Sequence, residues 1–284
     1  MKISIIDAGN FKLDGGAMFG VVPKTIWQKL VPADENNLCN WKMRCLLIED
    51  NNKLILIDTG MGDKQPEKWQ SYYYRNGDAS LISSIRQQGY HESQVTDVIL
   101  SHLHFDHCGG AVSWNSTKDN YQLTFPNAHY WTHTEHWNWA MNPNAREKAT
   151  FLSENLNPIF ESGNLNFIDK ANNYFGSNFD FLFANGHTEK MIMPVITKEE
   201  QKIIFAADTI PSFAHIHVPY CMSYDVRPLV TMEEKADLEN KIVKENIILM
   251  FDHDIENEAA ILEKTDRGFK PVKMGKLSEF INLG

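Results

Sequence analysis

The sequence predicts an α/β fold rich in antiparallel strands, arranged as a four-layer αβ/βα sandwich. Strand-like segments gather in two halves of the 284-residue chain, and each half also contains segments with helical spacing. Apolar runs separated by short polar turns are typical of hairpins, and they disfavour a fold built only from parallel βαβ units. No Gly-, Pro- or Ser-rich linker marks a boundary, so we expect a single domain over residues 1–284.

In the first half of the chain, apolar runs predict strands at 1–8, 44–49, 53–58, 95–101 and 127–132. The turn Asp50-Asn51-Asn52 makes the second and third of these strands a hairpin. Helical spacing predicts helices at 81–88, which ends near Gly89, and at 134–139. A third helix is expected at 146–156, after the helix-breaking run Asn142-Pro143-Asn144.

In the second half, three apolar runs predict strands at 179–184, 191–197 and 202–207. A charged segment with helical spacing predicts a helix at 231–245, which leads into a strand at 247–251. One more short helix is expected at 276–282, near the end of the chain.

Charge and cysteine usage limit the classes of partner. The chain has 27 Lys and Arg against 37 Asp and Glu, a net charge of −10, which disfavours nucleic acid and fits a small-molecule substrate. Four cysteines without C-x-x-C spacing are typical of reduced thiols, so we expect a cytoplasmic protein. The longest apolar stretches, such as 247–251, are too short to span a membrane, and no signal peptide is visible.

One short block carries most of the chemistry in the sequence. His102-Leu103-His104-Phe105-Asp106-His107 follows the predicted strand 95–101 and puts three imidazoles and a carboxylate within six residues. In an extended chain His102 and His104 point the same way, so both can reach one cation. Imidazole and carboxylate are ligands that zinc and similar dications take. Gly109 and Gly110 then allow a tight turn.

Four residues cannot complete the coordination of two such ions, so further ligands are expected at the ends of later strands. His187 follows the predicted strand 179–184, Asp208 follows 202–207, and His253 follows 247–251. Each is a polar side chain directly after an apolar strand, where side chains from several strands can converge. Alone, any one of them would be read as a turn former or a packed histidine.

With these residues the chain resembles the metallo-β-lactamase-fold hydrolase superfamily. The block at 102–107 is followed by His187, Asp208 and His253 in the order of that family, and Asp58 matches an Asp at the end of an early strand. The resemblance implies the four-layer αβ/βα sandwich and a site for two divalent metal ions. Zinc is favoured, with cobalt, manganese or iron as alternatives.

The resemblance also implies a role for each ligand. His102, His104 and His187 would hold the first metal, and Asp106, His107 and His253 the second. Asp208 would bridge the two ions, and Asp58 would orient a metal-bound histidine or the loop that carries the ligands. A hydroxide shared by the ions would attack the substrate, and Asp106 would act as the catalytic proton acceptor.

Departures from other branches of the family narrow the substrate. The commonest metallo-β-lactamases place a Cys where this chain has Asp208, so antibiotic hydrolysis is disfavoured. The chain looks closest to the N-acyl-homoserine lactonases and the related organophosphate and aryl-ester hydrolases. The residues expected to line the substrate site are Met18, Phe19, Trp27, Phe105, His215 and Tyr220. Pro211 stands where many lactonases have a catalytic Tyr, so Tyr220 or Tyr224 is expected to replace it.

Three functions stay open from the sequence. The first is the opening of an N-acyl homoserine lactone, that is, quorum quenching. The second is phosphotriester or aryl-ester hydrolysis on the same pair of metals, and the third is metal binding without catalysis. Exposed aromatic residues around Tyr72–Tyr74 would suit a homodimer surface.

Overall fold

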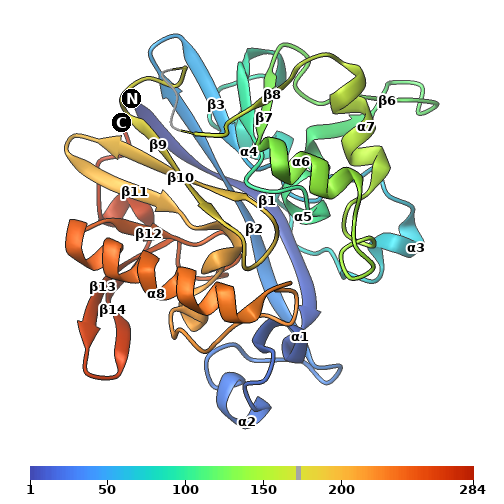
Figure 1. Cartoon of the computed structure of the whole chain (residues 1–284). Coiled ribbons are helices and arrows are strands. Elements are labelled where there is room, and N and C mark those ends of the chain that lie inside the picture. Colours follow the sequence, from blue (N-terminus) through green and yellow to red (C-terminus); the bar gives the residue numbers. More distant parts are fainter. Residues whose placement is uncertain (171–173) are drawn as a thin grey trace. The chain divides into compact units, whose positions relative to one another are not determined.

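The computed structural model describes residues 1–170 and 174–284 and confirms a mixed α/β chain (Figure 1). Its strands form two six-stranded sheets and one two-stranded sheet. The chain divides into two compact units, the first made of Met1–Phe11, Lys42–Lys170 and Gly284, and the second of Lys12–Trp41 and Ala171–Leu283.

The sheet of the first unit follows the order β1-β2-β3-β4-β7-β8. Its strands are β1 (Lys2–Asp14), β2 (Leu38–Asp50), β3 (Lys53–Ile57), β4 (Asp97–Ile99), β7 (His129–Thr132) and β8 (Leu165–Phe167). Strands β2 and β3 pair antiparallel across the short turn at 51–52, which confirms the predicted hairpin. Strands β3, β4, β7 and β8 are mutually parallel, so their carboxyl ends meet at one edge of the sheet.

Short helices and a small hairpin of β5 (Val112–Trp114) and β6 (Tyr121–Leu123) complete this unit. The helices are α3 (Glu67–Gln70), α4 (Leu81–Gln87), α5 (Phe105–Cys108), α6 (Thr134–Met141) and α7 (Ser153–Glu161). Helix α4 begins after Ser80, whose hydroxyl accepts a hydrogen bond from Ser83 N at 3.2 Å.

The prediction of a helix at 146–156 is wrong for its first half, because regular helix begins only at Ser153. The preceding residues form turns held by side chains. Asn144 Oδ1 accepts the amides of Arg146 and Glu147, and the Glu147 carboxylate accepts the Trp139 indole N–H at 2.7 Å. These bonds satisfy the backbone and hold Glu147 inward, 2% exposed.

The second unit has the sheet order β14-β13-β12-β11-β10-β9. Its strands are β9 (Phe179–Ala184), β10 (Met191–Lys198), β11 (Gln201–Phe205), β12 (Ile248–Met250), β13 (Ala259–Thr265) and β14 (Gly268–Gly275). Its helices are α1 (Gly15–Phe19), α2 (Lys24–Trp27) and α8 (Pro228–Glu245), of which α8 packs along the sheet against β13 (Figure 1). Only β11 and β12 pair in parallel among the described strands of this sheet.

The end of the chain differs from the prediction. The helix predicted at 276–282 is a single 3₁₀ turn at Leu277–Glu279, and the preceding residues form the antiparallel hairpin β13–β14. That hairpin was not predicted, because Lys, Glu and Thr side chains interrupt its apolar alternation.

Among the described residues, the structure has no helix with both the length and the apolarity to cross a membrane.

The parallel pairs explain where the predicted site residues lie within each unit. In the first unit Ile57 of β3 is in register with Ile99 of β4, so the segments after both strands leave the sheet side by side. In the second unit Phe205 of β11 is in register with Met250 of β12, and Asp208 and His253 follow these strands. Adjacent parallel strands therefore bring residues distant in sequence to one sheet edge.

Candidate metal centre

The predicted histidine block forms a compact cluster of imidazoles in the first unit. The ring centroids of His102 and His104 lie 4.5 Å apart, and those of His102 and His107 lie 4.0 Å apart. All three side chains are buried. The chain runs from β4 to the start of α5 over these residues, with His104 as the N-cap and His107 in the first turn.

Asp58 contacts this cluster through Ser101 and His107. Its Oδ1 accepts the amide of Ser101 at 2.7 Å, and its Oδ2 accepts the Ser101 hydroxyl at 2.7 Å. The same Oδ2 lies 2.9 Å from His107 Nδ1. A carboxylate at Nδ1 keeps the ring proton there, so the lone pair of His107 is on Nε2, the nitrogen that a metal would take.

The other two imidazoles are oriented in a similar way. His104 Nε2 lies 3.4 Å from Glu147 Oε1, and His102 Nδ1 lies 3.1 Å from the Ser101 hydroxyl. The amide of Leu103, between the two, donates to His136 Nε2 at 2.9 Å. Neither Glu147 nor His136 was found from the sequence, since they lie 43 and 33 residues from the block residues that they contact and carry no motif of their own.

Close backbone contact fixes the loop that carries His107. The amide and hydroxyl of Thr59 both donate to His107 O, at 2.7 and 2.8 Å. A Cβ at Gly109 would lie 2.1 Å from Met61 O, and one at Gly110 would lie 2.1 Å from Thr59 O. Only glycine allows the two loops to approach this closely, which is the physical reason for the Gly-Gly pair after the block.

Asp106 and Phe105 occupy the first turn of α5. The Asp106 side chain is 11% exposed, and its Oδ2 lies 3.7 Å from His107 Nε2. The ring of Phe105 contacts Tyr73 at 4.5 Å and Trp69 at 5.0 Å between centroids. Burial, together with the charge of Asp106, raises the pKa of Tyr73 to about 12. An apolar wall of three aromatic rings therefore lies next to the carboxylate.

In the second unit, Asp208 joins two histidines. Its Oδ2 lies 3.0 Å from His187 Nε2, and its Oδ1 lies 3.0 Å from His253 Nε2. The three side chains come from the segments that follow β9, β11 and β12, and all are buried. Each oxygen of one carboxylate thus faces a different imidazole, as in a ligand shared by two ions.

Asp225 orients the ring of His187. Its Oδ1 lies 3.0 Å from His187 Nδ1, and its Oδ2 accepts the Met222 amide at 3.0 Å. Burial favours the neutral imidazole of His187, but the carboxylates of Asp208 and Asp225 outweigh it and raise its pKa to about 10. A bound cation would take the place of that proton at Nε2.

The donor chemistry fits divalent metal ions. Residues whose ligand atoms are suited to such an ion are His102, His104 and His107 in the first unit and His187, Asp208, Asp252 and His253 in the second. Imidazole and carboxylate donors of this kind bind zinc and similar dications. Carboxylates at the far nitrogens of His107 and His187 are the partners that metal-bound histidines usually have. Asp252 was not named from the sequence, although it stands directly before His253.

Four residues predicted to line the substrate site form a stacked group in the second unit. Phe19 stacks on Trp27 at 5.2 Å and on His215 at 4.8 Å between ring centroids. His215 Nε2 lies 2.9 Å from Met18 O, and its Nδ1 lies 2.7 Å from Ser212 Oγ. Burial lowers the pKa of His215 to about 3, so the ring is neutral. Contact of these residues with a substrate stays a prediction.

The predicted tyrosines lie on the loop after His215. Tyr220 is half-buried, and Tyr224 is 37% exposed.

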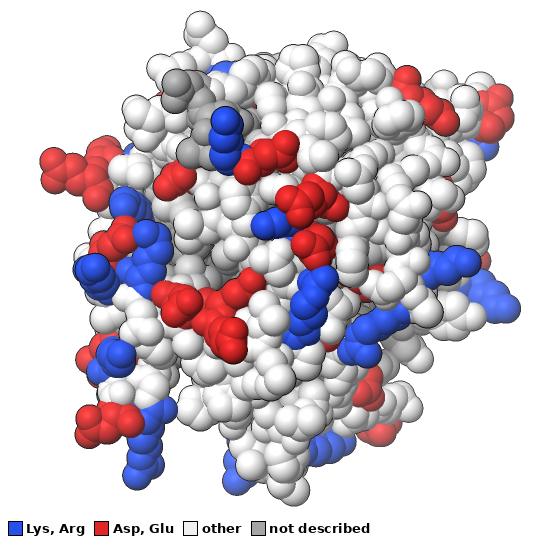
Figure 2. Space-filling view, in the orientation of Figure 1, with Lys and Arg blue, Asp and Glu red and all other residues white. Residues whose placement is uncertain are grey.

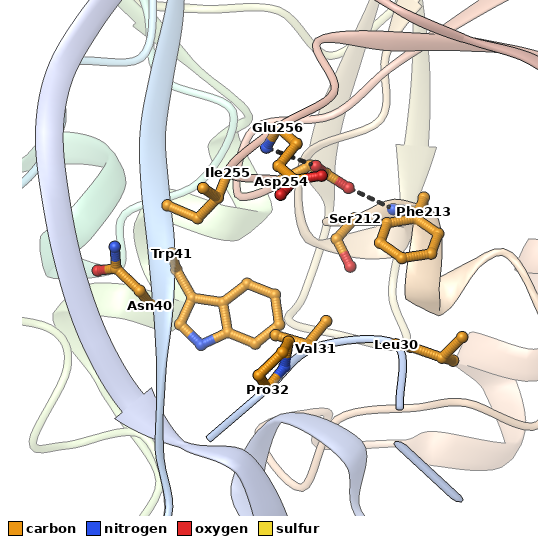
Figure 3. A pocket seen from close by; sticks show the side chains of 10 residues that line it. All are labelled: Leu30, Val31, Pro32, Asn40, Trp41, Ser212, Phe213, Asp254, Ile255 and Glu256. Carbon is orange, nitrogen blue, oxygen red and sulfur yellow. Dashed lines mark hydrogen bonds between the residues drawn. The ribbon is translucent and has the colours of Figure 1, made fainter. Parts of the chain in front are cut away.

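A cavity of about 200 Å³ lies elsewhere in the same unit, as Figure 3 shows. Its lining residues are Leu30, Val31, Pro32, Asn40, Trp41, Ser212, Phe213, Asp254, Ile255 and Glu256. The Asp254 carboxylate accepts the amides of Phe213 and Glu256, so each of its oxygens binds a backbone amide of the cavity wall.

Known proteins resemble the chain over most of its length. A family model described as "Metallo-beta-lactamase superfamily" matches residues 44–263. An N-acyl homoserine lactonase of Bacillus cereus is 24% identical over 272 residues, which are 90% of this chain and 94% of the relative. A "probable metal-dependent hydrolase" from Staphylococcus aureus has a TM-score of 0.86 at 26% identity and covers 96% of this chain and 95% of its own. The structure of AidC, a dizinc quorum-quenching lactonase in complex with its product, has a TM-score of 0.78 at 20% identity, with coverage of 95% and 93%.

Proposed function

The chain belongs to the metallo-beta-lactamase superfamily, and from this premise we propose that it is a binuclear metal-dependent hydrolase that opens the lactone ring of N-acyl homoserine lactones. The observation that carries the proposal is the Asp208 carboxylate, whose two oxygens each lie 3.0 Å from a different buried imidazole. Such a carboxylate suits two cations at once. The lactonases among the proteins that resemble this chain support the choice of substrate.

The proposed ligands are those that the resemblance implies, and Asp252 is a further donor beside Asp208 and His253. His102, His104 and His187 would hold one ion, Asp106, His107 and His253 would hold the other, and Asp208 would be shared by both. His107 and His187 each face a carboxylate through Nδ1, which leaves Nε2 as the donor to the ion. Zinc is the ion that these donors suit first, and cobalt, manganese or iron would fit the same set.

When bound, the two ions would supply an acidified water molecule and polarise the ester carbonyl. Asp106 would accept the proton that the attacking water gives up and pass it to the ring oxygen as the ring C–O bond breaks, so that this oxygen leaves as a hydroxyl group. Tyr220 or Tyr224, on the loop after Asp208, donates a hydrogen bond to the carbonyl oxygen. The net reaction adds one water across the ring ester bond and produces a hydroxy acid.

The aromatic wall of Trp69, Tyr73 and Phe105 is the proposed contact for the acyl chain. These rings pack within 5.0 Å of one another, and Phe105 directly precedes the proposed proton acceptor Asp106. Apolar rings next to the reacting group favour an alkyl chain, because they remove its surface from water. A substrate with a short acyl group would gain less from the same wall.

The setting of the reaction is also a proposal. The described cysteines, Cys39, Cys45, Cys108 and Cys221, form no disulfide, which suits a reducing cytoplasm. The partner is a small molecule. Tyr72 and Tyr74 are 60% and 51% exposed, and they are the residues through which we expect two copies to pair.

The test is acid release from a panel of esters by the zinc-loaded protein. We expect N-hexanoyl homoserine lactone to release one proton per ring opened, followed with a pH indicator in weak buffer. Hydrolysis of paraoxon or an aryl acetate with the lactone left intact would show a phosphotriesterase or arylesterase instead. Zinc binding without turnover of any ester would show a protein that binds metal but does not catalyse.

A further inference from the structure

Helix α8 carries two ionisable side chains on its buried side. Its outward face is charged, as Figure 2 shows, and Glu233 and Lys244 are exposed. Lys235 and Glu239, one turn apart, are instead 1% and 0% exposed. A buried lysine without good acceptors is strongly unfavourable, so the contacts of Lys235 should explain why it is there.

The Lys235 ammonium binds three backbone carbonyls of one loop. Its Nζ donates to His217 O at 3.1 Å, to Val218 O at 3.3 Å and to Tyr220 O at 3.0 Å. An ammonium has three N–H donors, and here each has a carbonyl acceptor. Burial lowers the pKa of Lys235, while the charges of Cys221, Glu239 and Asp225 act in the opposite direction.

The same loop leads directly to a proposed metal ligand. Beyond Tyr220 the chain turns so that the Met222 amide donates to Asp225 Oδ2 at 3.0 Å. The other oxygen of Asp225 lies 3.0 Å from His187 Nδ1. The Val226 amide donates to His187 O at 3.2 Å, so the end of the loop lies along the segment that bears the histidine. The loop is thus held at one end by Lys235 and contacts His187 at the other.

We propose that Lys235 is a positioning residue for the metal site: by binding three carbonyls of the loop it keeps Asp225 against His187 and so sets the direction of His187 Nε2. The inference rests on the proposed function only in taking His187 as a metal ligand. Lys235 acts through the loop and does not itself contact the ion. The proposed role of Lys235 does not depend on the identity of the substrate, so the inference holds for any ester that the site hydrolyses.

The experiment removes the three hydrogen bonds and measures zinc binding rather than catalysis. Lys235→Met keeps the length and apolar stem of the side chain but has no donor. We expect the weaker-bound zinc to be released to a chromophoric chelator at about 10-fold lower chelator concentration than in the unaltered protein. In zinc-free protein, we expect faster amide exchange over residues 217–225.

The matched control lies on the same helix. Lys241 pairs at the surface with Glu245 at 2.6 Å and is 39% exposed. Lys241→Met removes the same group from α8 without contact to the loop. It should leave both the zinc affinity and the exchange of residues 217–225 as in the unaltered protein.

A second comparison shows whether Lys235 acts through Asp225. Asp225→Asn should weaken zinc binding on its own, and adding Lys235→Met should weaken it by less than about 2-fold more. If Lys235→Met does not fold, Lys235→Gln, whose amide can donate to two of the carbonyls, enters the same comparison with a smaller expected loss.

Unchanged zinc affinity in the folded Lys235 variants, or losses that multiply in the double variant, would overturn the inference. Failure of the unaltered protein to bind two zinc ions would overturn the proposed function instead. The two failures are therefore distinguished before any substrate is added.

Discussion

The Asp58 carboxylate lies 2.9 Å from His107 Nδ1 and at the same time accepts both the amide and the hydroxyl of Ser101. One buried acid thus connects the end of β3, the end of β4 and the first turn of α5. Asp58 adopts a left-handed backbone conformation with φ of +58°, which turns the chain sharply out of β3. The same residue that ends the strand therefore also orients a proposed metal ligand.

Asp58→Asn removes the negative charge of Asp58 but keeps a side chain that is compatible with its backbone conformation. Asn tolerates the left-handed conformation as well as Asp does, so the turn should persist. The amide cannot hold the His107 proton as a carboxylate does, and we expect zinc affinity to fall by about 10- to 100-fold. Chelator competition measures this. An affinity equal to that of the unaltered protein would show that the contact does not orient a ligand.

Asp208→Ala should remove the ligand that both ions share. We expect at least one zinc to be lost after dialysis and the kcat/KM for the lactone to fall by at least about 1,000-fold, because water activation needs both ions. Elemental analysis and the acid-release assay measure the two effects. Asp180→Ala, which removes an exposed carboxylate on β9, is the control and should change neither.

Trp69→Ala should change the preference for acyl length rather than the reaction itself. Loss of one ring from the wall removes apolar contact with a long chain, and each buried methylene contributes about 0.8 kcal/mol. We expect kcat/KM to fall by about 10-fold for the N-decanoyl lactone and by less than about 2-fold for the N-butanoyl lactone. Tyr72→Ala is the control, because Tyr72 is a neighbouring residue that is 60% exposed. It should change kcat/KM for the two lactones by the same factor.

His215 should make the folded protein less stable in mild acid. Burial lowers its pKa from 6.5 to about 3, so between these values the unfolded chain binds a proton that the folded chain does not. The contribution of His215 to the free energy of unfolding therefore falls as the pH drops through that window, by about 2 kcal/mol from pH 7.5 to pH 5.

Urea unfolding with a chelator present measures this effect without bound metal. His215→Gln removes the titrating ring and keeps hydrogen-bonding groups near Ser212 and Met18. The variant should lose about 2 kcal/mol less stability over the same pH range. Parallel losses in both proteins would show that His215 does not titrate on unfolding.

The sequence predicts the parts of the candidate site that lie in local patterns. The block at 102–107 is visible because its donors are adjacent, and Asp208 and His253 are visible because each follows an apolar strand. The register of the parallel pairs β3–β4 and β11–β12 then brings such residues to one sheet edge within each unit. For these residues, strand prediction was enough.

The partners that orient the ligands could not be found in this way. Glu147, Asp225 and Lys235 are charged residues in turns and a helix, where the ordinary expectation is exposure to solvent. Each is buried because of contacts made with residues more than 14 positions away. Those contacts depend on how the loops pack, and no short sequence pattern encodes that packing.

The measurement that tests the account most directly is the number of zinc ions bound per chain after reconstitution, determined by elemental analysis beside a protein assay. The account predicts two ions in the unaltered protein and fewer in Asp208→Ala. A single ion or none in the unaltered protein, or two ions in the variant, would contradict it.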